Sequence, residues 1–389
     1  MGYREKKSYL LAIYLRYLNA GRSEKQRILD EFCAVCKYNR KYAIRLLKKG
    51  PTQPKKKTGP KSIYDDPALI EALKQFWLAS NQSCSRKLKV IIGPWLPCYE
   101  DVYGPLSSEI KQKLLTMGSA TIDRLLKPCR ATNKLKGRCT TKPGVLLKSQ
   151  IEMQFSHWDI QKPGYLEADT VAHCGTSIAG SFAWSLTVTD ICTGWTENRA
   201  MWNKEGGPVY ERISDVELSL PFEVLGFDCD NGAEFINHSL HDYFTKRKKP
   251  VAFTRSRPYR KNDNAHVEQK NWTHVRNLFG YERLEKYDVV KMMNDLYRNE
   301  WSLYQNHFIP TMKLLSKQRT GCKYKKKYEI PKTPYDRLLE SQFVEDATKA
   351  KLKAIHETLN PFKLKKEIER KLSDILRLAK SFRKNYQGY

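Results

Sequence analysis

The sequence predicts a mixed α/β domain that is preceded by all-α domains and followed by a helical tail. Three observations lead to this prediction. Helical patterns with N-terminal caps fill the first third of the 389-residue chain, and short β-rich runs alternate with helices between residues 165 and 255. After a basic, proline-containing connector at 323–334, Asn360 caps a last helix that has Pro361 at its first position.

The N-terminal segment predicts two short helices. A capping box at residues 23–26 begins the first, and Asn39 caps the second, which carries Arg40, Lys41 and Arg45. Such a pair fits a helix-turn-helix, whose second helix enters a DNA major groove, and it also fits plain bundle packing. The basic second helix favours the first interpretation.

A charged, proline-stiffened linker at 51–64 leads to a second helical region. Helical patterns lie there at about 67–78 and 85–96, and Ser119 caps a third helix, on which Arg124 lies. We expect this region to be a second helical DNA-binding unit.

The middle of the chain changes to strand patterns. Three meandering strands come first, and alternating helices and strands follow. The expected strands are 165–171, 181–190, 195–201, 222–230 and 251–255, with helices at about 208–217 and 233–246 and a long helix from about 263. This order specifies a mixed sheet with helices on its faces and right-handed crossovers.

The charge of +28 is unevenly distributed along the chain. Residues 1–150 carry a net charge of +20, residues 151–310 carry −4, and residues 311–389 carry +12. Solvated helix faces explain some of these charges but not the asymmetry. Two basic flanks around a mildly acidic middle indicate two regions that bind a polyanion such as DNA.

Three acids lie at informative places in the middle region. Asp169 lies in the first strand, Asp230 ends the fourth strand, and Glu268 lies in the first turns of the long helix. The two aspartates meet if the first and fourth strands are neighbours. Converging carboxylates repel one another unless divalent cations neutralise them, and their oxygens suit Mg²⁺ or Mn²⁺. Two such ions activate the attacking oxygen and stabilise the leaving oxygen in phosphoryl transfer.

Other acids compete for these roles. Asp228 shares a strand face with Asp230, but Asp230 is favoured because it adjoins an Asn-Gly turn. Glu167 shares a face with Asp169 and is interpreted as a flanking surface acid. Glu234 is interpreted as a helix N-terminal residue that complements the helix dipole.

Two motifs contain the second and third of these acids. They are Asp230-Asn-Gly-x-Glu-Phe and Pro258-Tyr-x-x-Asn-x-x-Ala-x-Val-Glu-x-x-Asn, with 37 residues between Asp230 and Glu268. Over about residues 160–310 the chain resembles the integrase core of DDE transposases and retroviral-type integrases. The resemblance implies a ribonuclease H-like fold, a DDE triad of Asp169, Asp230 and Glu268, and metal-dependent 3′ nicking followed by strand transfer. The whole layout resembles a bacterial insertion-sequence transposase.

The chain departs from the family pattern in two places. Many relatives have Asn-Gly shortly before the glutamate, whereas this chain has Asn264-Ala265, which predicts a stiffer loop. Retroviral integrases have a His-His-Cys-Cys zinc domain at the N-terminus, and this chain has no histidine before His157. The one C-x-x-C pair, Cys33 and Cys36, is interpreted as two small buried residues rather than as a zinc site.

Basic residues near the acids are candidates for contacts with the DNA backbone. They are Arg255, Arg257, Arg260 and Lys261 in the loop before the long helix, and Lys270 and Arg276 on that helix. His173 and His266 fit either a DNA or proton-transfer role or ordinary polar surface.

The last helix has apolar residues at 4-3-4-3 spacing. They are Ile368, Leu372, Ile375, Ala379 and Phe382. This spacing fits a short coiled contact between subunits and equally fits packing against the same chain.

These observations together predict six segments. They are a helix-turn-helix domain at 1–50, the linker at 51–64, a second helical DNA-binding domain at 65–130, a basic connector at 131–159, the catalytic core at 160–310, and a basic linker with a helical C-terminal region at 311–389. The expected function is a DNA transposase that uses two Mg²⁺ or Mn²⁺ ions. The alternatives are a DNA-binding regulator with an inactive core and a ribonuclease H-like nuclease that cuts without joining.

Expected partners are transposon-end DNA, target DNA and further copies of the chain, because two ends must be brought together. No run approaches the roughly 20 apolar residues of a membrane span. Ten cysteines without an export signal indicate reduced thiols, and hence a cytoplasmic, nucleoid-associated protein.

Overall fold

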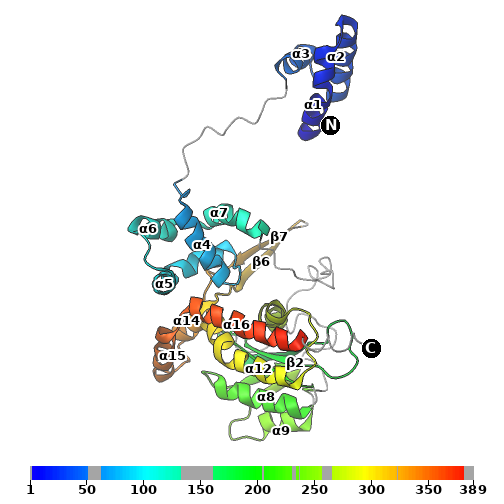
Figure 1. Ribbon diagram of the computed structural model, residues 1–389. Helices are drawn as coiled ribbons and strands as arrows, with labels where there is room; N and C mark the ends of the chain where they lie inside the picture. The colour runs from blue at the N-terminus through cyan, green and yellow to red at the C-terminus, as the bar shows by residue number, and fades with distance from the viewer. Residues whose placement is uncertain are drawn as a thin grey trace. The chain divides into compact units, whose positions relative to one another are not determined.

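The computed structural model describes residues 2–50, 63–132, 161–203, 206–229, 234–235, 237–255, 265–321 and 323–380. The chain divides into two compact units, Met1–Ile63 and Tyr64–Tyr389 (Figure 1). Most of the expected linker and connector lies outside the described residues. Among the residues that are described, no helix has both the length and the apolar character needed to cross a membrane.

The first unit contains α1 (Tyr3–Asn19), α2 (Arg22–Cys36) and α3 (Arg40–Lys49). The last two are the expected helices, and α1 was not expected. The three helices pack around Leu10, Ile13, Ile28, Leu29, Phe32, Cys36, Ala43 and Leu47. Asn39 caps α3 as predicted, since its Oδ1 accepts a 3.0 Å hydrogen bond from the N–H of Lys41.

The second unit begins with four helices. They are α4 (Pro67–Ala79), α5 (Ser85–Tyr103), α6 (Ser108–Thr116) and α7 (Ser119–Thr132). Four rings of these helices, Phe76, Trp95, Tyr99 and Tyr103, surround Phe362, which lies more than 250 residues further along the chain. The expected domain at 65–130 therefore shares its hydrophobic core with the rest of the unit.

Phe362 belongs to the last described helix, α16 (Pro361–Lys380). Asn360 caps it as predicted, because its Oδ1 accepts a 2.9 Å hydrogen bond from the N–H of Phe362. Ile368 and Ile375 are fully buried against the same chain. Of the two alternatives for this helix, the structure shows the intramolecular one.

A five-stranded sheet lies in the middle of the second unit, in the order β3-β2-β1-β4-β5. Its strands are β1 (Tyr165–Ala172), β2 (Trp184–Asp190), β3 (Thr196–Met201), β4 (Gly226–Cys229) and β5 (Ala252–Arg255). The first three form an antiparallel meander, and β4 and β5 run parallel to β1. The first and fourth strands are neighbours, which is the condition for Asp169 and Asp230 to meet.

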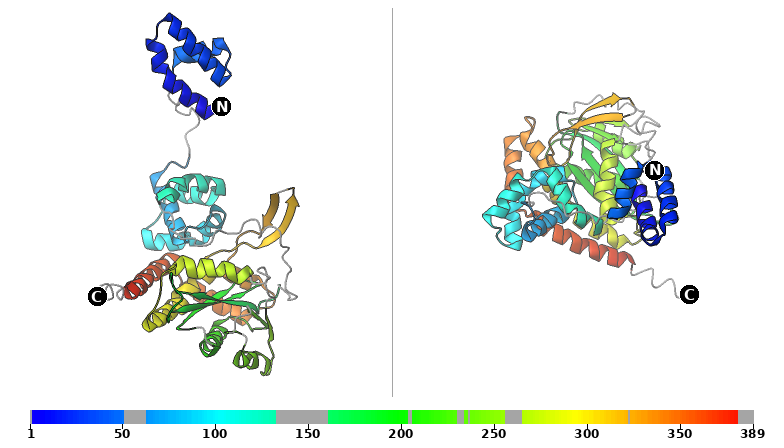
Figure 2. Two further views of the ribbon diagram at one scale, coloured as in Figure 1. Left: turned by 90° about the vertical axis from the view of Figure 1, so that its right-hand side faces the viewer. Right: turned by 90° about the horizontal axis from the view of Figure 1, so that it is seen from above.

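Helices cover both faces of this sheet (Figure 2). On one face lie α8 (Gly206–Ser219) and α9 (His238–Thr245), which pack on apolar side chains such as Leu166 and Ala168. On the other lies α10 (Ala265–Lys270), which continues as the π-helical turn η1 (Asn271–Arg276) and α11 (Asn277–Phe279). Neighbouring residues of β1 therefore face opposite layers, with Leu166 and Ala168 toward the core and Glu167 and Asp169 toward α10.

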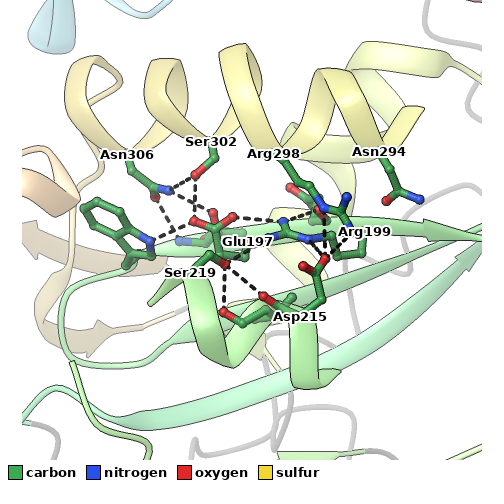
Figure 3. A network of polar contacts seen from close by, with 12 residues as sticks. Glu197, Arg199, Asp215, Ser219, Asn294, Arg298, Ser302 and Asn306 are labelled. Carbon is green, nitrogen blue, oxygen red and sulfur yellow. Dashed lines mark hydrogen bonds and ion pairs between the residues drawn. The ribbon is translucent and has the colours of Figure 1, made fainter. Parts of the chain in front are cut away.

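A long helical segment lies along the open edge of β3 (Figure 3). It consists of α12 (Tyr287–Leu296), η2 (Tyr297–Trp301) and α13 (Ser302–Phe308). Asn294 forms 2.8 and 2.9 Å hydrogen bonds with the N–H and C=O of Ala200, and Asn306 forms 2.9 and 3.0 Å bonds with those of Thr196. Each asparagine thus replaces a residue of a missing strand and blocks the edge against further pairing.

The C-terminal part adds a separate two-stranded ribbon and two helices before α16. The ribbon consists of β6 (Leu314–Thr320) and β7 (Lys323–Tyr328), and the helices are α14 (Pro334–Glu340) and α15 (Asp346–Thr358). The sequence predicted a connector at 323–334, whereas residues 323–328 form β7 and pair with β6.

Candidate active site

Asp169 lies near the end of β1 and is half-buried. Its Oδ1 accepts a 2.7 Å hydrogen bond from the N–H of Thr170, and its Oδ2 accepts a 2.6 Å bond from Nδ2 of Asn271. Asn271 begins η1, directly after α10. The strand and the helix are therefore joined at the first of the three predicted acids.

A second hydrogen bond fixes the start of α10. The carboxylate of Glu167 accepts a 3.1 Å bond from the N–H of Val267. Val267 and Asn271 are four residues apart and lie on one helix face, and Glu268 neighbours Asn271 at a spacing of three. The side chain of Glu268 is exposed and thus lies on the helix surface next to the residue that contacts Asp169.

Asp230, the second predicted acid, lies outside the described residues. It follows Cys229, the last residue of β4, in the sequence. The register pairs Cys229 with Ala168, the residue before Asp169. Arg257, Arg260 and Lys261 also lie outside the described residues.

Three further acids lie near Asp169, and two of them differ from expectation. Glu167 is not a surface acid, because it is only 3% exposed and binds α10. Glu234 is not in a helix, because α9 begins only at His238; it lies in the preceding turn, 3.4 Å from the hydroxyl of Thr170. Asp228, the rival acid, pairs in register with Glu167 and accepts a 2.6 Å hydrogen bond from the hydroxyl of Thr254.

The oxygen atoms at this place are of the chemical kind that a divalent cation such as Mg²⁺ prefers. Within the described ranges, no three histidine, cysteine or acidic side chains lie in a metal-binding group. The described donors are the carboxylates of Asp169 and Glu268 and the Oδ1 of Asn271, which is buried and has no hydrogen-bond partner. An unpaired buried oxygen beside a carboxylate is costly, and a hard cation such as Mg²⁺ would satisfy it.

Lys270 was expected to contact DNA, and the structure places it in the interior. It is 8% exposed, and its Nζ donates a 3.1 Å hydrogen bond to the carbonyl of Gly194. Burial lowers the pKa of Lys270 to about 7. In this position its ammonium group is not accessible to a DNA phosphate.

The remaining predicted DNA contacts differ in exposure. Arg276 is half-buried and lies 4.7 Å from the ring centroid of Tyr281, and burial lowers the pKa of its guanidinium. The side chains of Arg255, Arg124, Arg40, Lys41 and Arg45 are exposed. Arg40 forms an ion pair with Asp30 of the preceding helix.

Three consecutive carbonyls of the turn between β2 and β3 each accept a hydrogen bond from a cation. Lys313 binds the carbonyl of Cys192, Arg337 binds that of Thr193 at 3.1 Å, and Lys270 binds that of Gly194. These cations come from three separate segments. This convergence could not be predicted from the sequence, because the groups that accept the hydrogen bonds are backbone carbonyls, which every residue has.

His173, whose role the sequence left open, is fully buried directly after β1. Its Nε2 lies 2.8 Å from the hydroxyl of Ser185, which lies 2.8 Å from the hydroxyl of Tyr297. Burial lowers the pKa of His173 to about 3. The chain therefore holds this imidazole neutral in its core, where it is not accessible to a ligand at the surface.

This burial predicts acid sensitivity. Between about pH 6.5 and pH 3 the unfolded chain binds a proton at His173 that the folded chain does not, so stability falls as the pH falls. The slope from one such group is about 1.4 kcal/mol per pH unit. Urea unfolding between pH 7 and pH 5 should show a smaller slope for His173→Met than for the wild type. His241→Gln, a change at an exposed histidine, should keep the wild-type slope; an unchanged slope in His173→Met would contradict the prediction.

Comparison with known proteins identifies a relative. No family model matches the chain. The chain is 40% identical over 329 residues to an uncharacterized protein, y4rM, of Sinorhizobium fredii, and the match covers 84% of this chain and 93% of that protein. The chain belongs to the y4rM family. The structure of this member of the y4rM family contains a five-stranded mixed sheet, with Asp169 and the helix of Glu268 on one face.

Solved structures similar to this member of the y4rM family include three retroviral proteins. The catalytic core domain of BIV integrase matches with a TM-score of 0.29 and 16% identity, covering 46% of this chain and 95% of that chain. A simian T-cell lymphotropic virus intasome matches at 0.32 and 14%, covering 62% and 73%. The HTLV-2 integrase catalytic core domain in complex with magnesium matches at 0.28 and 14%, covering 39% and 91%.

Proposed function

We propose that the chain is a DNA transposase that binds transposon ends and catalyses metal-dependent 3′ nicking and strand transfer by a DDE mechanism. One observation carries the proposal. Asp169 on β1 is hydrogen-bonded to Asn271, on the helical segment that contains Glu268, and β1 is paired with the strand that precedes Asp230. The sheet therefore supports a convergence of the three acids that the family motif requires.

Asp169, Asp230 and Glu268 would hold two Mg²⁺ or Mn²⁺ ions, and these ions would activate an attacking oxygen and stabilise a leaving oxygen. Asn271 orients the carboxylate of Asp169, and Glu167 holds the start of the helix that presents Glu268. In the first step a water oxygen bonds to phosphorus while the bond to the 3′ oxygen breaks, which frees a 3′-OH. In the second step this hydroxyl attacks a target phosphodiester and displaces its 3′ oxygen, without a covalent enzyme intermediate.

The basic flanks would bind the DNA that this site cuts. The three-helix unit presents Lys41 and Arg45 on α3, both exposed, as a helix-turn-helix reader would. Phosphate contacts position the DNA, whereas the acids carry out the chemistry. Joining two transposon ends to a target requires more than one copy of the chain, so we propose a homo-oligomer on DNA. The ribonuclease H-like fold is part of the same proposal and is supported by the mixed sheet with helices on both faces.

A strand-transfer assay tests this function. Purified protein is incubated with Mg²⁺, a target plasmid and a labelled duplex that carries the inverted repeats flanking its coding region. The proposal predicts 3′ nicking of the labelled duplex followed by joined product. Binding without chemistry would instead support the regulator, and nicking without joining would support the nuclease.

Asn271 is a positioning residue in this proposal. Asn271→Leu removes the 2.6 Å hydrogen bond to Asp169 and the unpaired oxygen beside it, and should lower the nicking rate by about 10- to 100-fold. Because the loss acts through metal binding, the Mg²⁺ concentration for half-maximal rate should rise while DNA affinity stays unchanged. Asn299→Leu, at an exposed site on η2, should leave both values as in the wild type. An Asn271→Leu enzyme with a normal Mg²⁺ requirement would contradict the assigned role.

A further inference from the structure

The ribbon of β6 and β7 is the most basic element of the second unit. Its residues 314–328 include six lysines and arginines and no acid. Neither strand pairs with the five-stranded sheet, and the ribbon extends away from it (Figure 2). The side chains of Lys317, Arg319, Lys325, Lys326 and Lys327 are all exposed.

The arrangement of these charges does not stabilise the isolated ribbon. Lys317 lies directly opposite Lys326 in the antiparallel register, and like charges at opposite positions are unfavourable. An aromatic ring lies beside one of these charges, since the Nζ of Lys317 is 4.5 Å from the ring centroid of Tyr324. A lone two-stranded ribbon is already marginally stable in water, so its charges indicate a polyanionic partner.

The base of the ribbon is held firmly. Thr311 and Lys332 exchange hydrogen bonds of 2.8 and 3.1 Å below the strands, and Arg337 donates a 2.7 Å bond to the hydroxyl of Thr311. Lys313 donates to the turn between β2 and β3. That turn also binds Lys270, two residues after Glu268. The ribbon therefore begins at a turn that is itself attached to the helix of the candidate active site.

We propose that the ribbon is a DNA-binding arm that lies on double-stranded DNA next to the site of cleavage. The major groove, about 12 Å wide, admits a two-stranded ribbon. One ribbon face presents Lys317, Arg319 and Lys326 to the phosphates, and the other presents Lys325 and Lys327. The inference rests on the proposed function, to which it adds a contact that is separate from the helical N-terminal unit.

The salt dependence of duplex binding tests this arm. The variant Lys317→Gln/Lys326→Gln/Lys327→Gln is compared with Lys349→Gln/Lys351→Gln/Lys353→Gln on α15. The second variant removes the same charge from a helix on which Lys351 and Lys353 are exposed and Lys349 is half-buried. Fluorescence anisotropy with a random-sequence duplex is measured between 50 and 200 mM NaCl. Each lost phosphate contact should reduce the slope of log K against log salt by about 0.9. We expect the slope to fall by about 2 to 3 in the ribbon variant and to stay unchanged in the α15 variant.

A second variant tests whether a loss of DNA binding is caused only by misfolding of the ribbon. Lys326→Glu places an opposite charge across from Lys317 and should stabilise the ribbon, yet it should weaken duplex binding at least about tenfold at low salt. The proposed DNA-binding arm would be contradicted if the ribbon variant had the same salt slope as the wild type, or if the two triple variants lost the same amount of duplex affinity. A loss confined to single-stranded DNA would also contradict it.

Binding and chemistry separate the two proposals. If the wild type joins DNA and the ribbon variant binds DNA as the wild type does, only the proposed arm is contradicted. If the ribbon variant binds DNA more weakly than the wild type but the wild type never cuts DNA, only the transposase function is contradicted.

Discussion

Asp169→Asn is expected to reduce DNA nicking and joining by on the order of a thousandfold or more. The carboxamide keeps the size of the side chain but loses the negative charge that would hold a divalent cation beside the scissile phosphate. The amide oxygen can still accept the hydrogen bond from Asn271, whereas the bond from the N–H of Thr170 is lost because the amide nitrogen is not an acceptor. One lost hydrogen bond costs only about 1 kcal/mol, so the fold should be retained. Asp230→Asn and Glu268→Gln should show the same loss.

The control is a matched change at an acid outside the site. Asp288→Asn, at the start of α12, alters a 76% exposed carboxylate and should keep wild-type rates. Rates come from gel-resolved nicking of labelled end DNA, and anisotropy checks that each variant still binds the duplex. Normal nicking by Asp169→Asn, or an equal loss in Asp288→Asn, would remove the basis for the DDE assignment.

The largest expected effect on stability is at Arg199, which is 1% exposed on β3. Its guanidinium donates a 2.8 Å hydrogen bond to Ser219 and forms ion pairs of 3.1 Å with Glu197 and 2.5 Å with Asp215 (Figure 3). Glu197 is also buried, and burial raises the pKa of its carboxyl group. Arg199→Leu would leave this acid without its counter-charge and should lower the free energy of unfolding by about 3 to 5 kcal/mol.

Two companion variants separate the buried charge from the surface charge. Arg298→Leu removes a 43% exposed partner of the same Asp215 and should cost about 1 kcal/mol or less. Glu197→Gln in the Arg199→Leu background removes the second buried charge and should recover part of the loss. Urea unfolding at pH 7 measures all three, and an Arg199→Leu cost as small as that of Arg298→Leu would refute the prediction.

The sequence predicted those features that depend on local pattern. Strand alternation and turn residues located all five strands of the sheet, and asparagine caps located the starts of α3 and α16. The pairing of β1 with β4 was only a condition for Asp169 and Asp230 to meet, and the structure supplies it. Helix α1 was missed because Leu11, Leu15 and Leu18 are all exposed, so its apolar residues do not mark an inner face.

Tertiary contacts explain the remaining differences. Lys270 and Glu167 are charged and therefore look like surface residues in the sequence. In the structure both are buried, and each forms a hydrogen bond with a backbone group far away along the chain. Lys270 donates to the carbonyl of Gly194, and Glu167 accepts from the N–H of Val267. Asn294 and Asn306 pair with the edge of a strand that lies about 100 residues before them. No periodicity or local motif encodes such pairs, because only the assembled sheet brings them together.

The most direct test of the catalytic site is the position of bound Mn²⁺ in crystals of the protein with transposon-end DNA. Anomalous scattering locates the ion independently of any activity. We expect Mn²⁺ to be bound by oxygens of Asp169, Asp230 and Glu268 at about 2.1 Å, beside the scissile phosphate. Mn²⁺ bound elsewhere on the protein, with these three carboxylates too far apart to share it, would contradict the proposed DDE site.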